Sequence, residues 1–297
     1  MDHDLLRKLG AARGIAVGEP PAVGRAPSGD LELSYLDWGG DGPTAIFLHG
    51  GSLSAHTWDL VCSALRPRVR CVAMDLRGHG DSGWADAYRI EASVGDVLAL
   101  VDHLGVARPH LVGMSLGGCV AGHSAAALGE RTASLTFIDV VDHVDFGASA
   151  NLRGFMGAIT TTASVEEMVA KALAVSPQTD PDLMLYRYQA LMKAGPDGFG
   201  LRQDRRGPPD FPHILGKLAD LEGQAADIAC PVLVVRGARS RIVTDDTAAA
   251  FAGRFPDGRW CVIPEAGHNV QEDNPVALAQ TLEAHILGHE IAHAPAN

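Results

Sequence analysis

The sequence lacks the features of several classes of protein. Its five cysteines include no C-x-x-C pair, which argues against a disulfide framework and against a zinc knuckle. Basic residues are outnumbered, with 24 Lys and Arg against 36 Asp and Glu, so the formal charge of -12 argues against nucleic acid or an acidic membrane as a partner. No run is long and apolar enough to cross a bilayer. The N-terminal residues also lack the apolar stretch of a secretory signal, so we expect a cytoplasmic protein.

What is present has the pattern of a globular α/β protein. The chain has 297 residues, of which 46% are hydrophobic and 20% charged, and single α/β domains commonly reach this length. Apolar strand-like runs alternate with helix-like runs such as Val94 to Leu104 and Leu116 to Leu128. This alternation predicts a mostly parallel central sheet flanked by helices. The runs expected to form strands are LELSYLDW, TAIFLHG, VRCVAMD, PHLVGMS and SLTFIDV.

The alternation is interrupted once, which indicates an insertion. It stops after Asp139 and resumes only at Pro231 to Gly237. Between them lie the helix-like stretches SVEEMVAKALAV and LMLYRYQALMKA, followed by a segment rich in Gly, Pro and Arg. We expect a helical cap over the strand ends, where it would enclose a pocket. The predicted organisation is an N-terminal extension made of a short helix and a linker (1–29), a core domain (30–144 and 227–297) and a helical cap domain (145–226).

A G-x-S-x-G pattern joins an expected strand to an expected helix. Gly113, Ser115 and Gly117 lie in HLVGMSLGGCVAG, between an apolar run and a helix of small residues. A tight turn of this kind leaves no room for side chains beside the serine, which explains the two glycines. Chance matches occur in a chain with 34 glycines, so the strand and helix on either side carry the weight. They predict that Ser115 is a nucleophile that a downstream histidine activates.

Four segments give the chain a resemblance to the α/β-hydrolase superfamily, from about Leu31 to Leu287. The resemblance implies the α/β-hydrolase fold. It also implies that the backbone N–H groups of Gly51 and Leu116 form an oxyanion hole, in which each donor contributes about 3 kcal/mol. His268, after the last strand-like run, would be the general base, and histidine suits reversible proton transfer near neutral pH. The four segments are FLHGGSLSAHTW, DLRGHGDS, GMSLGG and EAGHNVQEDNP.

The acid of the expected triad departs from the family pattern. Similar proteins usually carry an Asp in the turn after the strand that matches PVLVVRG, but here residues 238–241 read Ala, Arg, Ser, Arg. An acid is needed to fix the histidine tautomer and to stabilise the imidazolium. We expect Asp139 in this role, because haloalkane dehalogenases and some lactone hydrolases of the superfamily place their acid at the matching strand end.

Other carboxylates remain candidates for the acid of the triad. Asp245 and Asp246 are the main alternative, although Thr244 before them fits a helix cap with acids in the first turn, which is a structural role. Asp142 and Asp145 are further candidates close behind Asp139.

The expected cap contains side chains suited to a pocket. Arg202, Arg205 and Arg206 could bind a substrate carboxylate, although a short charged run more often forms a solvated surface. The apolar and aromatic residues also have the spacing of an internal core of the cap. These residues are Met184, Tyr186, Tyr188, Met192, Phe199 and Phe211.

Together these observations predict a serine hydrolase, without cofactor or metal, that cleaves a carboxylic ester or lactone of a mainly apolar small molecule through an acyl-enzyme. The serine argues against epoxide hydrolase and dehalogenase chemistry, for which similar proteins use Asp. Carbon–carbon bond hydrolysis of a diketone-like substrate would use the same residues and stays open. A ligand-sensing protein on the same framework also stays open, because the usual late acid is missing. The N-terminal extension offers a surface for a homodimer.

Overall fold

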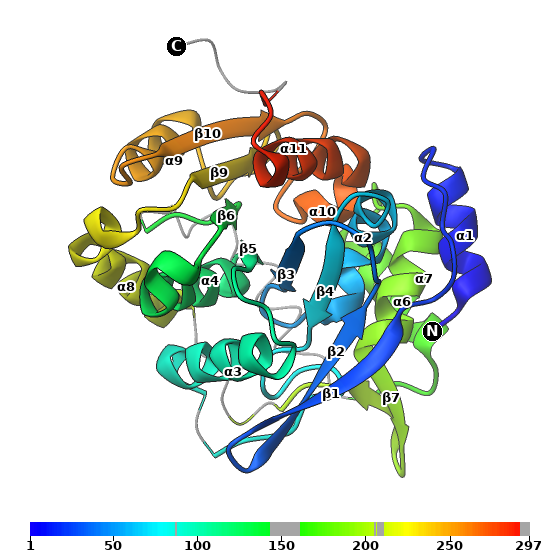
Figure 1. Cartoon of the computed structure of the whole chain (residues 1–297). Helices are drawn as coiled ribbons and strands as arrows, with labels where there is room; N and C mark the ends of the chain where they lie inside the picture. The colour runs from blue at the N-terminus through cyan, green and yellow to red at the C-terminus, as the bar shows by residue number, and fades with distance from the viewer. Residues whose placement is uncertain (87, 143–160, 205, 207–210, 292–297) are drawn as a thin grey trace.

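The computed structural model contains a central sheet with helices on both sides (Figure 1). The structure describes residues 1–86, 88–142, 161–204, 206 and 211–291. The eight strands of the sheet follow the order β1-β2-β4-β3-β5-β6-β9-β10. The pairs β1–β2 and β2–β4 are antiparallel, and the other pairs are parallel, which confirms the predicted sheet. The strands are β1 (Ala22–Ser28), β2 (Leu31–Asp37), β3 (Thr44–Leu48), β4 (Arg70–Met74), β5 (His110–Met114), β6 (Ser134–Ile138), β9 (Val232–Gly237) and β10 (Gly258–Ile263).

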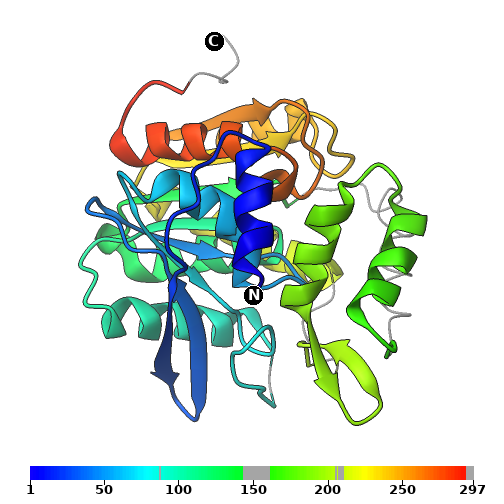
Figure 2. The same ribbon diagram turned by 90° about the vertical axis from the view of Figure 1, so that its right-hand side faces the viewer.

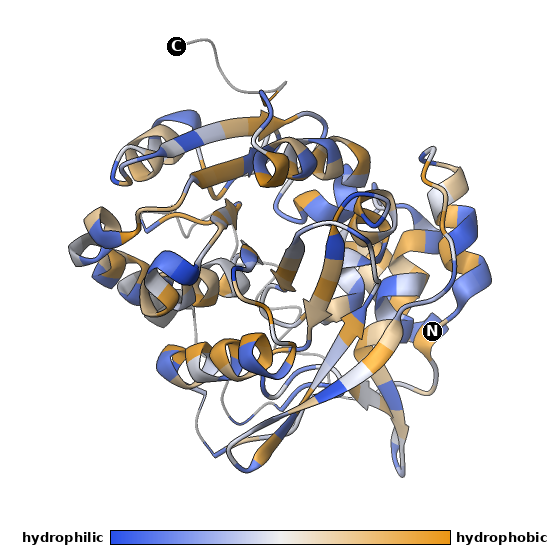
Figure 3. Ribbon diagram, viewed as in Figure 1, coloured by the Kyte–Doolittle hydropathy of each residue, from blue (hydrophilic) through white to orange (hydrophobic). Residues whose placement is uncertain are grey.

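Helices cover both faces of the sheet because side chains alternate along its strands. In β3, Ile46 and Leu48 pack into the apolar core on one face, and Ala45 and Phe47 pack into the core on the other. Figure 3 shows the inner strands mainly in hydrophobic colours, whereas the outer helices carry both colours. The first core is covered by α3 (Ile90–His103), α4 (Leu116–Leu128) and α9 (Asp245–Ala252), and the second by α2 (Asp59–Leu65) and α11 (Pro275–Leu287).

The carboxyl ends of the parallel strands meet at one edge of the sheet, where ligands of α/β proteins bind. The chain turns there from β3 into η1 (Ala55–Trp58), from β5 into α4, and from β10 into α10 (Val270–Asp273). The motif residues of the sequence are therefore on loops at a common edge. At the opposite edge, the short helix η2 (Gly129–Arg131) leads from α4 into the start of β6.

The N-terminal segment contains the predicted short helix, but part of the predicted linker forms a strand. Helix α1 (His3–Ala11) buries Leu6 and Leu9 and contacts α2, and residues 22–28 form the edge strand β1, paired with β2 along its full length. The sequence did not predict this strand, because Gly24 and Pro27 are uncommon within strands. A Cβ on Gly24 would lie 2.1 Å from the Tyr35 ring, and an edge strand tolerates a proline, which has no N–H group to donate.

The inserted segment contains helices and one hairpin. Helices α6 (Val165–Val175) and α7 (Pro181–Leu191) pack together beside the main body in Figure 2. They are followed by the strands β7 (Met192–Gly195) and β8 (Gly198–Leu201). β7 replaces the last three residues of the expected helical stretch LMLYRYQALMKA, and β8 lies in the segment rich in Gly, Pro and Arg. Pro196 disfavours the helical conformation at Gly195, the last residue of β7.

The later part of the insertion joins the main body. Helix α8 (Phe211–Asp220) packs against α4, and Leu218 and Leu221 are buried in the core of that face. The short helices η4 (Leu221–Gly223) and η5 (Ala225–Asp227) then lead to β9. The region predicted as a cap thus contains a peripheral α6–α7 pair and a segment from α8 onward that lies on the core.

Candidate active site

Ser115 lies in a tight turn between β5 and α4. Its backbone has φ 52° and ψ −116°, a strained conformation for a residue with a side chain. A Cβ on Gly113 would lie 2.2 Å from the Gly117 oxygen, and a Cβ on Gly117 would lie 2.2 Å from the Leu48 oxygen. Both glycines are therefore required by close backbone contacts, as the G-x-S-x-G pattern predicted.

The two expected oxyanion donors lie on either side of this turn. Leu116 is the first residue of α4, and the N–H groups of a first helical turn have no partner within the helix. Gly51 belongs to the loop after β3, in which a Cβ on Gly50 would lie 3.4 Å from the Ser115 Cβ. The loop therefore passes directly beside Ser115, and the two N–H groups remain candidates for binding an oxyanion.

The structure brings Asp139 and His268 into contact. Asp139 follows β6, and its carboxylate Oδ2 lies 2.8 Å from His268 Nδ1. Asp139 is completely buried, whereas the His268 side chain is 24% exposed. Within the described residues no hydrogen bond joins Ser115 to His268, although β5, β6 and β10 bring all three residues to the same sheet edge. Such bonds are often long in ligand-free enzymes.

Two neighbours from the turn after β9 hold the Asp139 carboxylate. The backbone N–H of Gly237 donates to Oδ1 at 3.1 Å, and the hydroxyl of Ser240 donates to Oδ2 at 2.7 Å. Our sequence reasoning missed both residues because it searched this turn for a carboxylate. The available signal was a serine in the turn where similar proteins carry the acid.

The other candidate acids have partners of their own. Thr244 caps α9, and Asp245 and Asp246 lie in the first turn of that helix, as expected for a structural role. Asp245 also forms an ion pair with Arg236. Asp142 forms an ion pair with Arg254. Asp145 lies outside the described residues.

A pair of buried histidines supports the loop after β3. His49 Nδ1 donates to the Gly50 oxygen at 2.7 Å, and its Nε2 accepts from the Leu76 N–H at 3.0 Å. The ring of His79 lies edge-on to it, with the centroids 5.0 Å apart. Burial lowers the pKa of His49 to about 4 and that of His79 to about 3, so both rings are neutral at pH 7.

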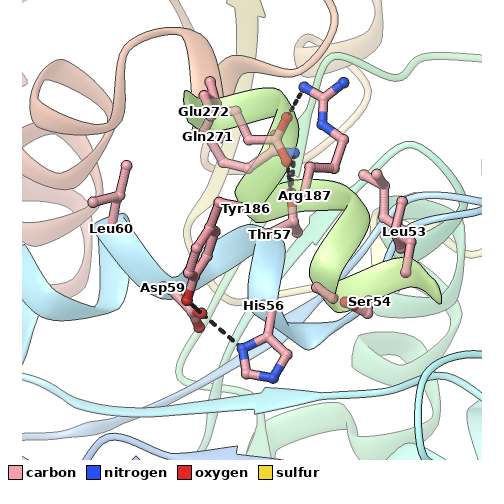
Figure 4. A pocket seen from close by; sticks show the side chains of 13 residues that line it. Leu53, Ser54, His56, Thr57, Asp59, Leu60, Tyr186, Arg187, Gln271 and Glu272 are labelled. Carbon is pink, nitrogen blue, oxygen red and sulfur yellow. Dashed lines mark hydrogen bonds and ion pairs between the residues drawn. The ribbon is translucent and has the colours of Figure 1, made fainter. Parts of the chain in front are cut away.

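Helix α7 contacts the core through two polar groups, the first centred on Asp59 (Figure 4). The hydroxyl of Tyr186 donates to Asp59 Oδ2 at 2.5 Å, and His56 Nδ1 lies 2.7 Å from the same oxygen. Burial disfavours the charged form of His56, but the charge of Asp59 outweighs it and raises the pKa of His56. The contact attaches the peripheral helix pair to α2 and η1.

The second polar group attaches α7 to α10, close to His268 in the chain. Arg187 forms an ion pair with Glu272, which also accepts from the Thr57 hydroxyl at 2.9 Å, and Gln271 donates to that hydroxyl at 2.8 Å. Burial disfavours the charge of Arg187, but Glu272 outweighs it and raises the pKa of Arg187. These side chains line a cavity of about 20 Å³, and Figure 4 shows them around it.

The predicted pocket residues of the insertion mostly pack against one another. Arg202 pairs with Asp81 and Arg206 with Asp204, whereas Arg205 and the Phe211 side chain are outside the described set. The small core between α6 and α7 contains Met184, Tyr188 and Met192, with Phe199 against it, and Tyr186 makes the contact with Asp59.

Disulfides, metal ligands and membrane-spanning helices would indicate other classes of protein. All five cysteines are free in the structure, and four of them are buried. No group of three His, Cys, Asp or Glu side chains in the described ranges could hold a metal ion. Of the helices that the structure describes, none has the length and apolar character to cross a membrane.

Comparison with known proteins identifies the family of this chain. A sequence profile described as the alpha/beta hydrolase fold matches residues 43–275. The chain is 30% identical over 275 residues to Esterase Rv0045c of Mycobacterium tuberculosis (strain ATCC 25618 / H37Rv), covering 89% of this chain and 88% of that protein. It is 26% identical over 295 residues to a haloalkane dehalogenase of Mesorhizobium japonicum, covering 90% and 91%.

Solved structures agree with the sequence comparison. The crystal structure of Esterase Rv0045c matches with a TM-score of 0.76 and 28% identity over 94% of this chain and 95% of that one. The crystal structure of E-2-(acetamidomethylene)succinate hydrolase matches with a TM-score of 0.77 and 23% identity over 90% and 99%, and shares the fold. This chain is therefore a member of the α/β-hydrolase fold family.

Proposed function

We propose that the chain is a serine esterase in which Ser115 is the nucleophile, His268 the general base and Asp139 the orienting acid. The observation that carries this proposal is the 2.8 Å contact between Asp139 Oδ2 and His268 Nδ1, at the sheet edge where Ser115 stands in a strained turn. The similarity to Esterase Rv0045c supports the choice of reaction.

The contact with Asp139 assigns a role to each ring nitrogen of His268. With Nδ1 donating to the carboxylate, the neutral ring presents the lone pair of Nε2 as the base. Ser115 Oγ would bond to the acyl carbon of the ester and pass its proton to Nε2. The imidazolium would then give that proton to the departing alcohol, leaving an acyl-enzyme that water hydrolyses through the same steps.

The negative charge that develops on the carbonyl oxygen would be stabilised by the N–H groups of Gly51 and Leu116. Leu116 begins α4, so the positive end of the helix dipole adds to its effect. Donors fixed in this way need no reorganisation during the reaction, and each contributes about 3 kcal/mol of transition-state stabilisation.

The serine also favours acyl transfer over dehalogenation, although a haloalkane dehalogenase is among the relatives. Displacement of a halide by a carboxylate gives an ester that water can cleave. Displacement by Ser115 would give an alkyl ether, which a histidine and a water molecule do not cleave. Carboxylic esters and lactones of mainly apolar small molecules are thus the proposed substrates, and diketone-like substrates are the alternative that uses the same residues.

A fluorophosphonate probe tests the nucleophile directly. We expect a single adduct by intact mass, mapped to the peptide that contains Ser115 and absent in Ser115→Ala. Turnover of a panel of aryl esters, lactones and one diketone should then follow the labelled serine. Folded wild-type protein that forms no adduct and cleaves no ester would refute the proposed function and favour a ligand-sensing protein.

A further inference from the structure

Ser240 makes a complete set of hydrogen bonds in the turn between β9 and α9. Its hydroxyl donates to Asp139 Oδ2 at 2.7 Å and accepts from the backbone N–H groups of Ile242 at 3.1 Å and Val243 at 3.3 Å. A serine hydroxyl has one hydrogen and two lone pairs, so every position is used. The two accepted bonds fix the oxygen in the turn, and its hydrogen is thereby directed at the carboxylate.

The Asp139 carboxylate depends on these fixed donors. It is completely buried, and a buried carboxylate must be compensated by hydrogen bonds. Oδ1 accepts from the Gly237 N–H, while Oδ2 accepts from both Ser240 and His268. Rotation of the carboxylate about its Cβ–Cγ bond would break the bonds to Gly237 and Ser240 together. The orientation that meets His268 is therefore set by the β9–α9 turn.

We propose that Ser240 is a positioning residue for catalysis, which holds Oδ2 of Asp139 against His268 Nδ1. This inference rests on the proposed function, because it assigns Asp139 as the acid. The turn that carries the acid in similar proteins would here supply a hydroxyl that orients an acid borne by the neighbouring strand β6. The triad would thus depend on a fourth side chain for its geometry.

The charged side chains near His268 and Ser240 in the chain bond to groups other than the Asp139 carboxylate. Asp273, five residues after His268 in the chain, accepts from the Gly267 N–H at 2.8 Å. Arg239, next to Ser240, forms an exposed ion pair with Glu265. Neither pair has a described contact with Asp139, so loss of the Ser240 hydroxyl leaves Gly237 as the one donor to the carboxylate besides His268 itself within the described part of the chain.

The test compares three variants with wild type. Ser240→Ala removes the hydroxyl, and Ser240→Thr retains it. Thr244→Ala is the matched control. It removes a hydroxyl that caps α9 four residues after Ser240 and has no described contact with Asp139. Activity towards an aryl ester is measured well below the melting temperature of every variant, with Tm recorded for each.

We expect Ser240→Ala to lower kcat about 10- to 100-fold with KM within about twofold, as for a small misplacement of a catalytic group. Ser240→Thr should restore most of kcat. Thr244→Ala should lower Tm while kcat stays near wild type. A merely structural serine would lower Tm without changing kcat, so kcat of Ser240→Ala within twofold of wild type would overturn the inference. Equal losses of kcat in Ser240→Ala and Thr244→Ala would overturn it too.

A second measurement keeps the inference separate from the proposed function. The Nδ1 proton that His268 shares with Asp139 should give a downfield proton NMR signal, which is assigned by its loss in His268→Gln. We expect this signal in wild type, Ser240→Thr and Thr244→Ala, and its broadening or loss in Ser240→Ala. An unchanged signal in Ser240→Ala would refute the positioning role, even if the protein proves to have no esterase activity. A protein that shows the expected signals without turnover would refute only the esterase proposal.

Discussion

Asp139 and His268 are 129 positions apart in the chain, yet their side chains meet at 2.8 Å. The contact is possible because Asp139 follows the end of β6 and His268 lies in the loop after the end of β10, and both strands end at the same edge of the sheet. A buried carboxylate that accepts from a histidine at this edge has the geometry of an orienting acid. It leaves the turn after β9 free to carry a different residue.

The acid is tested by removing one charge. Asp139→Asn should lower kcat about 10⁴-fold, because the amide cannot hold the histidine in the required tautomer or stabilise the imidazolium. Asp246→Asn should leave kcat near wild type, since Asp246 lies in the first turn of α9. Steady-state kinetics with an aryl ester, together with circular dichroism, would decide between them. The reverse pattern would assign the acid to Asp246.

The strain at Ser115 predicts that glycine is tolerated better than alanine at this position. Glycine adopts φ 52° and ψ −116° more easily than alanine, so Ser115→Gly should exceed Ser115→Ala in free energy of unfolding by about 1 kcal/mol. Ser124, inside α4, is the matched control, where the order should reverse because glycine weakens a helix. Urea unfolding gives the free energy of unfolding of Ser115→Gly, Ser115→Ala, Ser124→Gly and Ser124→Ala. The same order at both positions would argue against strain at the elbow.

Much of this fold was predictable because its signals are local. Alternating apolar runs identified the strands from β2 to β6, and the close backbone contacts of Gly113 and Gly117 explain why the motif is readable in sequence. The edge strand β1 was missed because Gly24 and Pro27 are poor strand formers, and its stability comes from pairing with β2. The β7–β8 hairpin was missed because the helical pattern of α7 runs into it.

The candidate site was predictable only where one residue type suits one task. Ser115 and His268 have such chemistry, and Asp139 was the carboxylate left at a suitable strand end. Ser240 was not predictable, because a hydroxyl acquires its role only through the position of another side chain. The contact that defines this role joins residues 101 positions apart, which no local pattern reveals.

Removal of one partner of the buried ion pair between Arg187 and Glu272 should destabilise the protein strongly. Only 17% of the Arg187 side chain and 6% of the Glu272 side chain are exposed, so Glu272→Gln would leave a buried charge without its partner. We expect the free energy of unfolding to fall by about 3 kcal/mol. Lys171→Gln is the control, because its ion pair with Glu167 is exposed and should contribute less than about 0.5 kcal/mol. Equal effects in urea unfolding would contradict the burial argument.

The buried pair of histidines predicts loss of stability in mild acid. The pKa of His49 is lowered from 6.5 to about 4 in the folded protein, so between these values the unfolded chain binds more protons. The contribution of neutral His49 to the free energy of unfolding is complete above about pH 6.5, falls as the pH drops towards 4, and is lost below that. The full cost is about 3 kcal/mol for His49.

The variant His49→Gln removes this titration and should flatten the decline in free energy of unfolding between pH 6.5 and 4. Burial raises the pKa of Asp75, which acts in the opposite sense as that carboxyl takes up a proton, so wild type and variant must be compared over the whole range. Urea unfolding at half-unit steps of pH gives the two curves. Parallel curves would show that His49 takes no part in the acid sensitivity.

The position of Ser240 predicts that the acid can be moved. Its hydroxyl lies 2.7 Å from the carboxylate oxygen that contacts His268, so a carboxylate at position 240 would bring an oxygen close to the same nitrogen. Asp139→Asn combined with Ser240→Asp should therefore recover at least about tenfold of the kcat lost in Asp139→Asn, since charge near the imidazolium is restored. Ser240→Asn in the same background is the control, because it has the same shape without the charge. Equal kcat for these two double variants would show that the turn cannot supply the acid, and that Asp139 is required at its own position.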